Sequence, residues 1–189
     1  MANKEQEARL IARAAAGSRS AFGDLYERYL DDIYRYIYYR VPDAVTAEDL
    51  TEEVFIRAWQ KLPETQRIKA VQNFRAWLYR IAHNRVVDYL RSTKKQVHSA
   101  LEDSAHFIEG SETPEALLQT QQQGDYLAQA ITSLGDPMQQ VILLRFVNQC
   151  SHAETAQILG LQENHVRVIQ YRALKQLRSQ LEQDLQNGK

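Results

Sequence analysis

The sequence is short of the residues that interrupt helices or cross-link a chain. Its 189 residues include only four prolines, seven glycines and one cysteine, Cys150. A single cysteine excludes an intramolecular disulfide and speaks against a cysteine-rich metal cage. We therefore expect Cys150 to be a small buried apolar side chain, and we expect neither a metal site nor a cofactor.

Long apolar runs are also missing. No stretch approaches the roughly 18 consecutive apolar residues that a membrane-spanning helix needs, so we expect no membrane insertion. The first ten residues, MANKEQEARL, contain no apolar run of the signal-peptide type. These two absences predict a cytoplasmic protein.

One segment lacks positive charge altogether. The formal net charge of the chain is −1, yet residues 96–125 contain six acidic residues and no Lys or Arg, whereas residues 1–95 carry 17 basic and 13 acidic residues. The acidic segment also has few large apolar side chains, so it buries too little surface to offset the entropy of ordering. We predict a flexible acidic linker over residues 93–113, between domains at residues 1–92 and 114–189.

Both domains are predicted to be helical, so the fold class is all-α. Alternating strand patterns are absent, and apolar residues recur at helical spacing from Phe22 to Ile37. Thr46 followed by Asp49 fits a capping box that starts the next helix, which we expect Pro63 to end. A short helix near residue 10 is expected before these, and further helices are expected near residues 74–95, 114–133, 137–149, 152–159 and 163–185.

The last two predicted helices fit a helix-turn-helix at about residues 152–172. Gly160 lies between them, where a sharp turn needs a residue that tolerates positive φ. The apolar residues Val166, Ile169, Ala173 and Leu177 then define the inward side of the second helix. Such a helix can enter the major groove of DNA, where Arg and Asn read base edges. Its outward residues are Asn164, Arg167, Val168, Tyr171, Lys175 and Arg178.

The helix over residues 74–95 combines basic and aromatic side chains with a single acid, Asp88. Cations bind a phosphate backbone and aromatic rings stack on unpaired bases, so this mixture suits single-stranded or melting DNA. Trp77 fits the apolar stripe and is assigned to packing, whereas Tyr79 and His83 fall outside it and are candidate contacts. The basic residues are Arg75, Arg80, Arg85, Arg91, Lys94 and Lys95.

The helix that begins near Thr46 carries a cluster of acids. Acids in a first turn complement the helix dipole, which accounts for Glu48 and Asp49 without any function. The helix dipole does not account for the apolar side chains beside these acids. An acidic and apolar strip suits a basic protein surface and repels DNA. The candidate docking residues are Asp49, Glu52, Glu53, Phe55 and Ile56.

Three segments resemble, in order, the parts of region 2 in bacterial RNA polymerase sigma factors: FGDLYERYLDDIYRYIYYRV, AEDLTEEVFIRAWQKL and FRAWLYRIAHNRVVDYLR. LGDPMQQVILLRF followed by AETAQILGLQENHVRVIQYRALKQLR is similar to region 4. A chain with only these regions resembles the extracytoplasmic-function (ECF) group of the sigma-70 family. The resemblance covers roughly residues 10–95 and 114–182.

This resemblance implies a transcription initiation factor and not an enzyme. In that family, region 2 binds the clamp helices of the largest subunit of core RNA polymerase and opens the −10 promoter element. Region 4 reads the double-stranded −35 element and contacts the flap of the second-largest subunit. An anti-sigma factor commonly holds such proteins inactive, so we expect that partner here.

The resemblance also assigns residues to each surface. The family's docking pattern falls on Asp49, Glu52, Glu53 and Phe55. Asn84 stands at the position that commonly contacts an unstacked base in that family. The implied −10 residues are Arg75, Tyr79, Arg80, His83, Asn84, Arg85 and Arg91, and the implied −35 residues are Gln162, Glu163, Asn164, Arg167, Val168, Tyr171, Arg172 and Lys175.

Two other classes of function compete with this interpretation. A stand-alone helix-turn-helix regulator would account for the last domain, but not for the acidic strip or the basic aromatic helix. An enzyme with a di-metal site in a helical bundle would need Glu-x-x-His on facing helices. That pattern occurs nowhere in the chain, and neither does a P-loop.

Overall fold

A computed structural model describes residues 2–41, 43–66, 73–100 and 130–186, and every regular element in these ranges is a helix, as predicted. None of these helices is long and apolar enough to span a membrane. The first domain contains α1 (Ala2–Ala15), α2 (Arg19–Tyr38), α3 (Ala44–Gln66) and α4 (Phe74–Ala100), and the second contains α6 (Asp136–Ile142), the π-helical segment η2 (Leu143–Val147), α7 (His152–Leu159) and α8 (Glu163–Gln186).

Both ends of α3 differ from the prediction. The helix begins at Ala44 and is capped by Asp43, whose carboxylate accepts hydrogen bonds of 2.8 Å from the backbone N–H and the hydroxyl of Thr46. Pro63 lies inside the helix, which continues to Gln66. Pro63 has no backbone N–H, so the helical hydrogen bond that residue 63 would donate to the Trp59 carbonyl is absent, yet the helix continues past it.

The predicted boundary after residue 92 also differs, because α4 is helical as far as Ala100. The first part of the predicted acidic linker is therefore helical. The rest of the linker, residues 101–113, and most of the helix expected near 114–133 lie outside the described residues.

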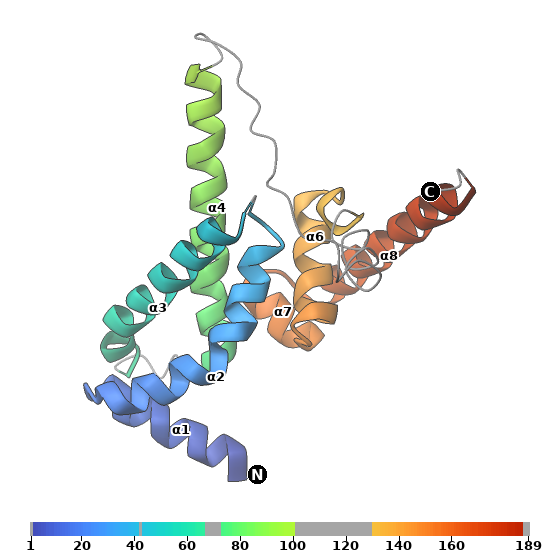
Figure 1. Cartoon of the computed structure of the whole chain (residues 1–189). Helices are drawn as coiled ribbons and strands as arrows, with labels where there is room; N and C mark the ends of the chain where they lie inside the picture. The colour runs from blue at the N-terminus through green and yellow to red at the C-terminus, as the bar shows by residue number, and fades with distance from the viewer. Residues whose placement is uncertain (1, 42, 67–72, 101–129, 187–189) are drawn as a thin grey trace, which may run out of the picture.

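The helices α1 to α4 lie together in Figure 1, and the core between them is rich in aromatic side chains. Phe55 of α3 meets Tyr26 of α2 edge to face, with ring centroids 4.7 Å apart, and Tyr36 of α2 meets Tyr79 of α4 at 5.5 Å. Tyr36 and Tyr79 are fully buried. Complete burial of a large side chain stabilises a fold by about 1.5–3 kcal/mol, so these contacts fix α3 and α4 against α2.

The helix-turn-helix has the predicted geometry. Gly160 ends α7 in the left-handed conformation, with φ of 67°, and Ser151 begins α7 through a capping box with Glu154. Thr155 is buried, and its hydroxyl donates to the Ser151 carbonyl at 2.9 Å, so this polar group has a partner. The predicted inward residues of α8 are at most 8% exposed: Val166, Ile169, Ala173 and Leu177.

The two domains lie against each other. α4 packs against α7, α2 packs against η2, and Figure 1 shows α6 and α7 beside α2 and the lower part of α4. Leu143, Leu144 and Ile158 belong to the same buried cluster as the core of the first domain. Cys150 is fully buried in that cluster, as predicted, and burial raises the pKa of its thiol to about 11.

Candidate functional site

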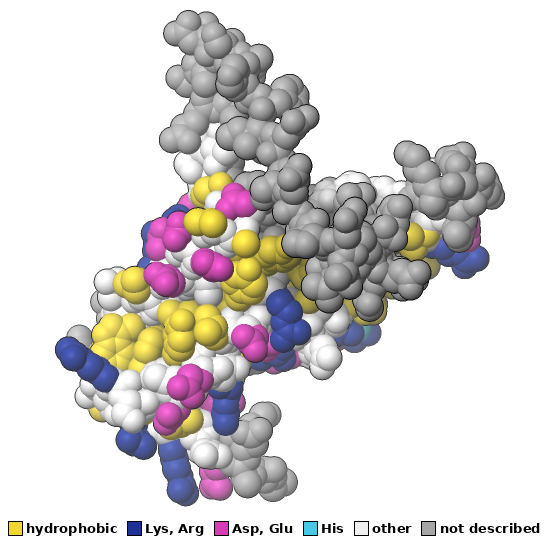
Figure 2. All heavy atoms as spheres, in the orientation of Figure 1, with side chains coloured by type: hydrophobic (Ala, Val, Ile, Leu, Met, Phe, Trp, Pro, Cys, Tyr) yellow, Lys and Arg dark blue, Asp and Glu magenta, His cyan; other side chains and the backbone are white. Residues whose placement is uncertain are grey.

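The acidic strip is present on α3. Asp49, Glu52 and Ile56 are all exposed, and their spacing of three and four residues places them on one face of the helix. Ile56 is 55% exposed and Val45, one turn before Asp49, is 68% exposed. Figure 2 shows acidic and hydrophobic side chains gathered together where α3 lies in Figure 1. The strip thus combines negative charge with apolar surface that solvent reaches.

Two of the predicted docking residues are engaged in contacts within the protein. Phe55 is only 4% exposed because it packs on Tyr26, so the expectation that its side chain contacts a partner is corrected to a packing role. Glu53 forms an ion pair with Arg85 of α4, with an N–O distance of 2.6 Å. Both side chains thereby hold α3 in place beneath the exposed strip.

The predicted −10 residues of α4 divide into two sets. Asn84 and Arg91 are exposed, and Arg85 is paired with Glu53 as described. His83 is half-buried, with Nδ1 lying 3.3 Å from the Tyr36 hydroxyl. Burial, with a contribution from the Arg40 cation, lowers the pKa of His83, so this side chain is neutral near pH 7.

The other set faces the second domain. Arg75 donates to the backbone carbonyl of Asn148, and Arg80 donates to that of Gln157 at 3.1 Å. Tyr79 is completely buried, so its predicted role as an exposed contact is wrong for this arrangement. The Tyr79 ring packs edge to face on Tyr36 of α2, and α7 also packs against α4.

The outer face of α8 is exposed from Glu163 to Glu182. Val168 is 47% and Tyr171 is 70% exposed, and Arg167 pairs with Glu163 one turn earlier at 2.5 Å. The other predicted −35 residues are exposed as well: Gln162, Asn164, Arg172 and Lys175.

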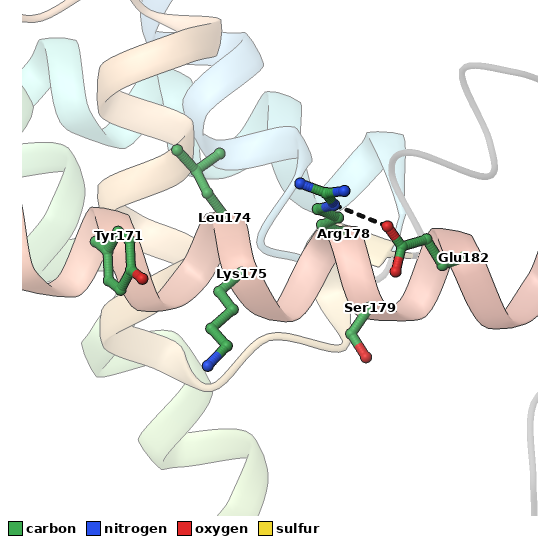
Figure 3. Close-up of a pocket in the computed structure, with 6 residues that line it drawn as sticks. All are labelled: Tyr171, Leu174, Lys175, Arg178, Ser179 and Glu182. Carbon is green, nitrogen blue, oxygen red and sulfur yellow. Dashed lines mark hydrogen bonds and ion pairs between the residues drawn. The ribbon is translucent and has the colours of Figure 1, made fainter.

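A shallow groove continues this face toward the end of α8. Tyr171, Lys175 and Ser179 project from one side of the helix in Figure 3, and Arg178 pairs with Glu182 at 2.7 Å. Leu174, which the sequence reasoning did not select, is 41% exposed beside them. The face therefore offers cations, an aromatic ring and an amide to a ligand.

Val45 was missed because the helix was expected to begin at Thr46. It stands four residues before Asp49 on the same face, so helical spacing from the true start at Ala44 would have included it. Among the described residues, no group of three or more His, Cys, Asp or Glu side chains is placed to hold a metal ion.

The sequence matches two family models, sigma-70 region 2 over residues 25–96 and sigma-70 region 4 over residues 130–179. It is 37% identical to the ECF RNA polymerase sigma factor BldN of Streptomyces coelicolor over 175 residues, which are 93% of this chain and 66% of BldN. It is 27% identical to the ECF RNA polymerase sigma factor SigW of Bacillus subtilis, over 90% of this chain and 94% of SigW. The chain thus spans just under two thirds of BldN and nearly all of SigW.

Solved structures share the fold. The structure of CnrH in complex with the cytosolic domain of CnrY has a TM-score of 0.74 at 24% identity, covering 95% of this chain and 99% of that chain. The sigma factor RpoE from Bartonella quintana, in complex with the anti-sigma factor NepR, has a TM-score of 0.65 at 21% identity, covering 85% of this chain and 96% of that chain. With regions 2 and 4 in the order that the motifs indicated, this chain belongs to the ECF group of the sigma-70 family of RNA polymerase sigma factors.

Proposed function

We propose that this protein binds core RNA polymerase and directs it to promoters by recognising −10 and −35 elements. Catalysis of RNA synthesis then belongs to the polymerase, and the protein acts in the cytoplasm, where the polymerase works. The observation that carries this proposal is the exposed strip of Asp49, Glu52 and Ile56 on α3, in a chain that also exposes the outer face of a helix-turn-helix. A stand-alone regulator has no use for the first of these surfaces.

The α3 strip is the surface that we assign to the clamp helices of the largest polymerase subunit. Neither Asp49 nor Glu52 takes part in an ion pair within the described residues, so their charge is available to a basic partner. Burial of Ile56 and Val45 would add apolar contact at the centre of that interface. Glu53 and Phe55 act indirectly, by holding the strip in position.

The outer face of α8 is assigned to the −35 element. Arg167 can donate two hydrogen bonds to a guanine edge, and Asn164 can pair with adenine in the same groove. Lys175 and Arg172 suit phosphates on either side. For the melted −10 element the exposed residues are Arg80, Asn84 and Arg91 on α4, whereas the Arg75 guanidinium is half-buried and donates to the Asn148 carbonyl.

An anti-sigma factor is proposed as a further partner. CnrH is bound to the cytosolic domain of CnrY in its structure, and RpoE is bound to the anti-sigma factor NepR in the other. Both share the fold of this chain over most of its length. A protein inhibitor that covers the α3 strip would exclude polymerase without changing the fold.

The test is reconstitution of transcription with core polymerase. The wild-type protein is expected to bind core enzyme in a pull-down and to start transcripts at discrete sites. Replacing Asp49 and Glu52 by Lys should abolish both, because two attractive charges become repulsive. Asp24 and Glu27 of α2 are exposed at the same spacing, so their replacement by Lys is the matched control and should leave binding intact. Unchanged binding by the α3 variant with normal helicity would refute the assignment.

A further inference from the structure

Two tyrosines near the end of α2 form an aromatic pair at the surface. Tyr34 and Tyr38 are one turn apart, and their ring centroids lie 5.7 Å apart with an angle of 30° between the rings. Tyr38 is 46% exposed and Tyr34 is half-buried. A third ring, that of Tyr39, meets Tyr38 edge to face at 5.7 Å. The pair therefore offers aromatic surface to solvent in a defined position.

Glu48 of α3 places a carboxylate beside this pair. Burial raises the pKa of Tyr34, and the negative charge of Glu48 adds to the rise, so the carboxylate lies within electrostatic reach of the ring. Glu48 is exposed and has no hydrogen bond or ion pair in the described part of the chain. It stands one turn before Glu52 of the exposed strip, so the aromatic pair and the strip form one continuous surface.

A ring face beside a carboxylate suits a cation. The negative face of an aromatic ring attracts a Lys ammonium or an Arg guanidinium that lies within about 6 Å of its centre. The protein uses this contact inside region 2, where the Arg40 guanidinium lies 5.5 Å from the centre of the Tyr36 ring. Among the described residues no cation lies over Tyr34 or Tyr38, so the faces of these two rings are available to a partner.

The charges around the pair also decide between two kinds of ligand. Aromatic rings stack on unpaired bases as well, but a nucleic acid brings a phosphate with each base. Glu48 is exposed beside the pair and Asp49 is exposed on the adjoining strip, so both carboxylates repel a phosphate backbone. A cation carried by a protein is attracted by the carboxylates and by the ring faces alike.

We propose that Tyr34, Tyr38 and Glu48 form a binding site for one arginine or lysine side chain of core RNA polymerase, at the edge of the α3 strip. The choice of polymerase rests on the proposed function, because polymerase is the partner assigned to the strip. The class of ligand, a side-chain cation, rests on the ring pair and on the carboxylate beside it.

A hexa-arginine peptide tests the class of ligand without polymerase. NMR spectra of the full-length protein with ring-labelled tyrosine would follow each ring as the peptide is added. The signals of Tyr34 and Tyr38 should shift, and Glu48→Gln should reduce these shifts. Tyr171 is the internal control, because its ring is 70% exposed but lies beside Lys175. Shifts at Tyr171 as large as those of the pair would overturn the proposal, even if the protein binds polymerase normally.

Binding of the full-length protein to core polymerase then tests the partner. The double variant Tyr34→Leu/Tyr38→Leu keeps apolar side chains but removes the ring faces, so it should bind roughly tenfold more weakly, the order expected for two cation–π contacts. Tyr34→Phe/Tyr38→Phe keeps the ring faces and is the matched control, which should bind within about twofold of the wild type. If the double Leu variant does not fold by circular dichroism, Tyr38→Leu alone takes its place, at the more exposed ring.

Two outcomes of the polymerase experiment would overturn the site. Equal affinity of the Leu variant and the wild type would show that any apolar side chain suffices, and equal weakening by Leu and Phe would show that the hydroxyls matter and not the ring faces. The proposed function is tested separately, by the binding of the wild type and by its loss when Asp49 and Glu52 are replaced by Lys.

Discussion

The helices α4 and α8 carry the two faces assigned to DNA, and their availability is opposite. Both combine arginine with tyrosine, but Tyr79 of α4 is fully buried whereas Tyr171 of α8 is 70% exposed. The Arg75 guanidinium is half-buried and donates to the Asn148 carbonyl, while Arg167 is exposed and, among the described residues, bonds only to Glu163 on its own helix. Residue chemistry alone therefore does not show when a face can bind. In this arrangement the face assigned to duplex DNA is exposed, whereas the face assigned to melted DNA is exposed only in part.

The largest expected effect comes from exchanging each tyrosine for alanine. Tyr79→Ala should lower the free energy of unfolding by about 3–5 kcal/mol, as for other large aromatic side chains lost from a core. Tyr171→Ala should change it by less than about 0.5 kcal/mol, because its ring is mostly in solvent. Urea unfolding of the two variants measures the difference. Similar losses of stability would show that the two faces are packed alike, against this account.

The next effect concerns base recognition by the exposed face. If the Arg167 guanidinium reads a guanine, Arg167→Ala should weaken discrimination at one base pair of the −35 element by about 1–3 kcal/mol of binding free energy. Arg80→Ala should leave −35 binding by the protein unchanged, because that residue belongs to the other region. Binding of a set of base-substituted −35 duplexes at two salt concentrations separates the cases. If Arg167→Ala lowers the affinity equally for every −35 duplex and weakens its salt dependence, Arg167 contacts a phosphate and not a base.

A smaller effect is expected from pH, through His83 of α4. The pKa of His83 is lowered by burial and by Arg40, with Asp136 offsetting part of this, so the unfolded chain binds a proton more readily than the folded one. Stability should then fall as the pH drops below about 6.5, the ordinary pKa of histidine, and level off below the folded pKa. Urea unfolding across this range should show a flatter profile for His83→Gln. An identical profile for the two proteins would show that His83 does not contribute to the pH dependence of stability.

The smallest effect is expected from Glu163→Gln on the open face. The substitution removes an exposed ion pair worth about 0.5 kcal/mol at most and a negative charge that faces phosphate, so −35 affinity should rise by roughly a factor of two. The rise should be the same for every −35 sequence. A selective loss at one cytosine position would instead show that the Glu163 carboxylate accepts a hydrogen bond from a base.

The sequence predicted what is local and periodic. The phase of apolar residues gave the inward side of α8, and Gly160 was identified as the left-handed end of α7, as the structure shows. The exposure of Asp49, Glu52 and Ile56 also followed from helical spacing. These features need only the periodicity of one helix and the conformational freedom of one residue.

What the sequence did not predict depends on contacts between distant segments. Arg40 and Asp136 form an ion pair although they are 96 residues apart, so no local pattern relates them. Tyr79 was taken for an exposed contact because it lies outside the apolar stripe read from the sequence of α4, whereas its ring packs on Tyr36 of α2. Phe55 was assigned to docking because it stands in the family's pattern, whereas its ring packs on Tyr26 and positions the strip from below.

Binding of the wild-type protein to the two promoter elements, with and without core polymerase, tests the central claim most directly. Fluorescence anisotropy would follow a labelled −35 duplex and a labelled −10 single strand taken from a promoter on which the holoenzyme initiates. The account predicts measurable binding of the −35 duplex by the protein alone, and tight binding of the −10 strand only after core polymerase is added. Binding of the −10 strand by the protein alone, as tight as that by the holoenzyme, would contradict it.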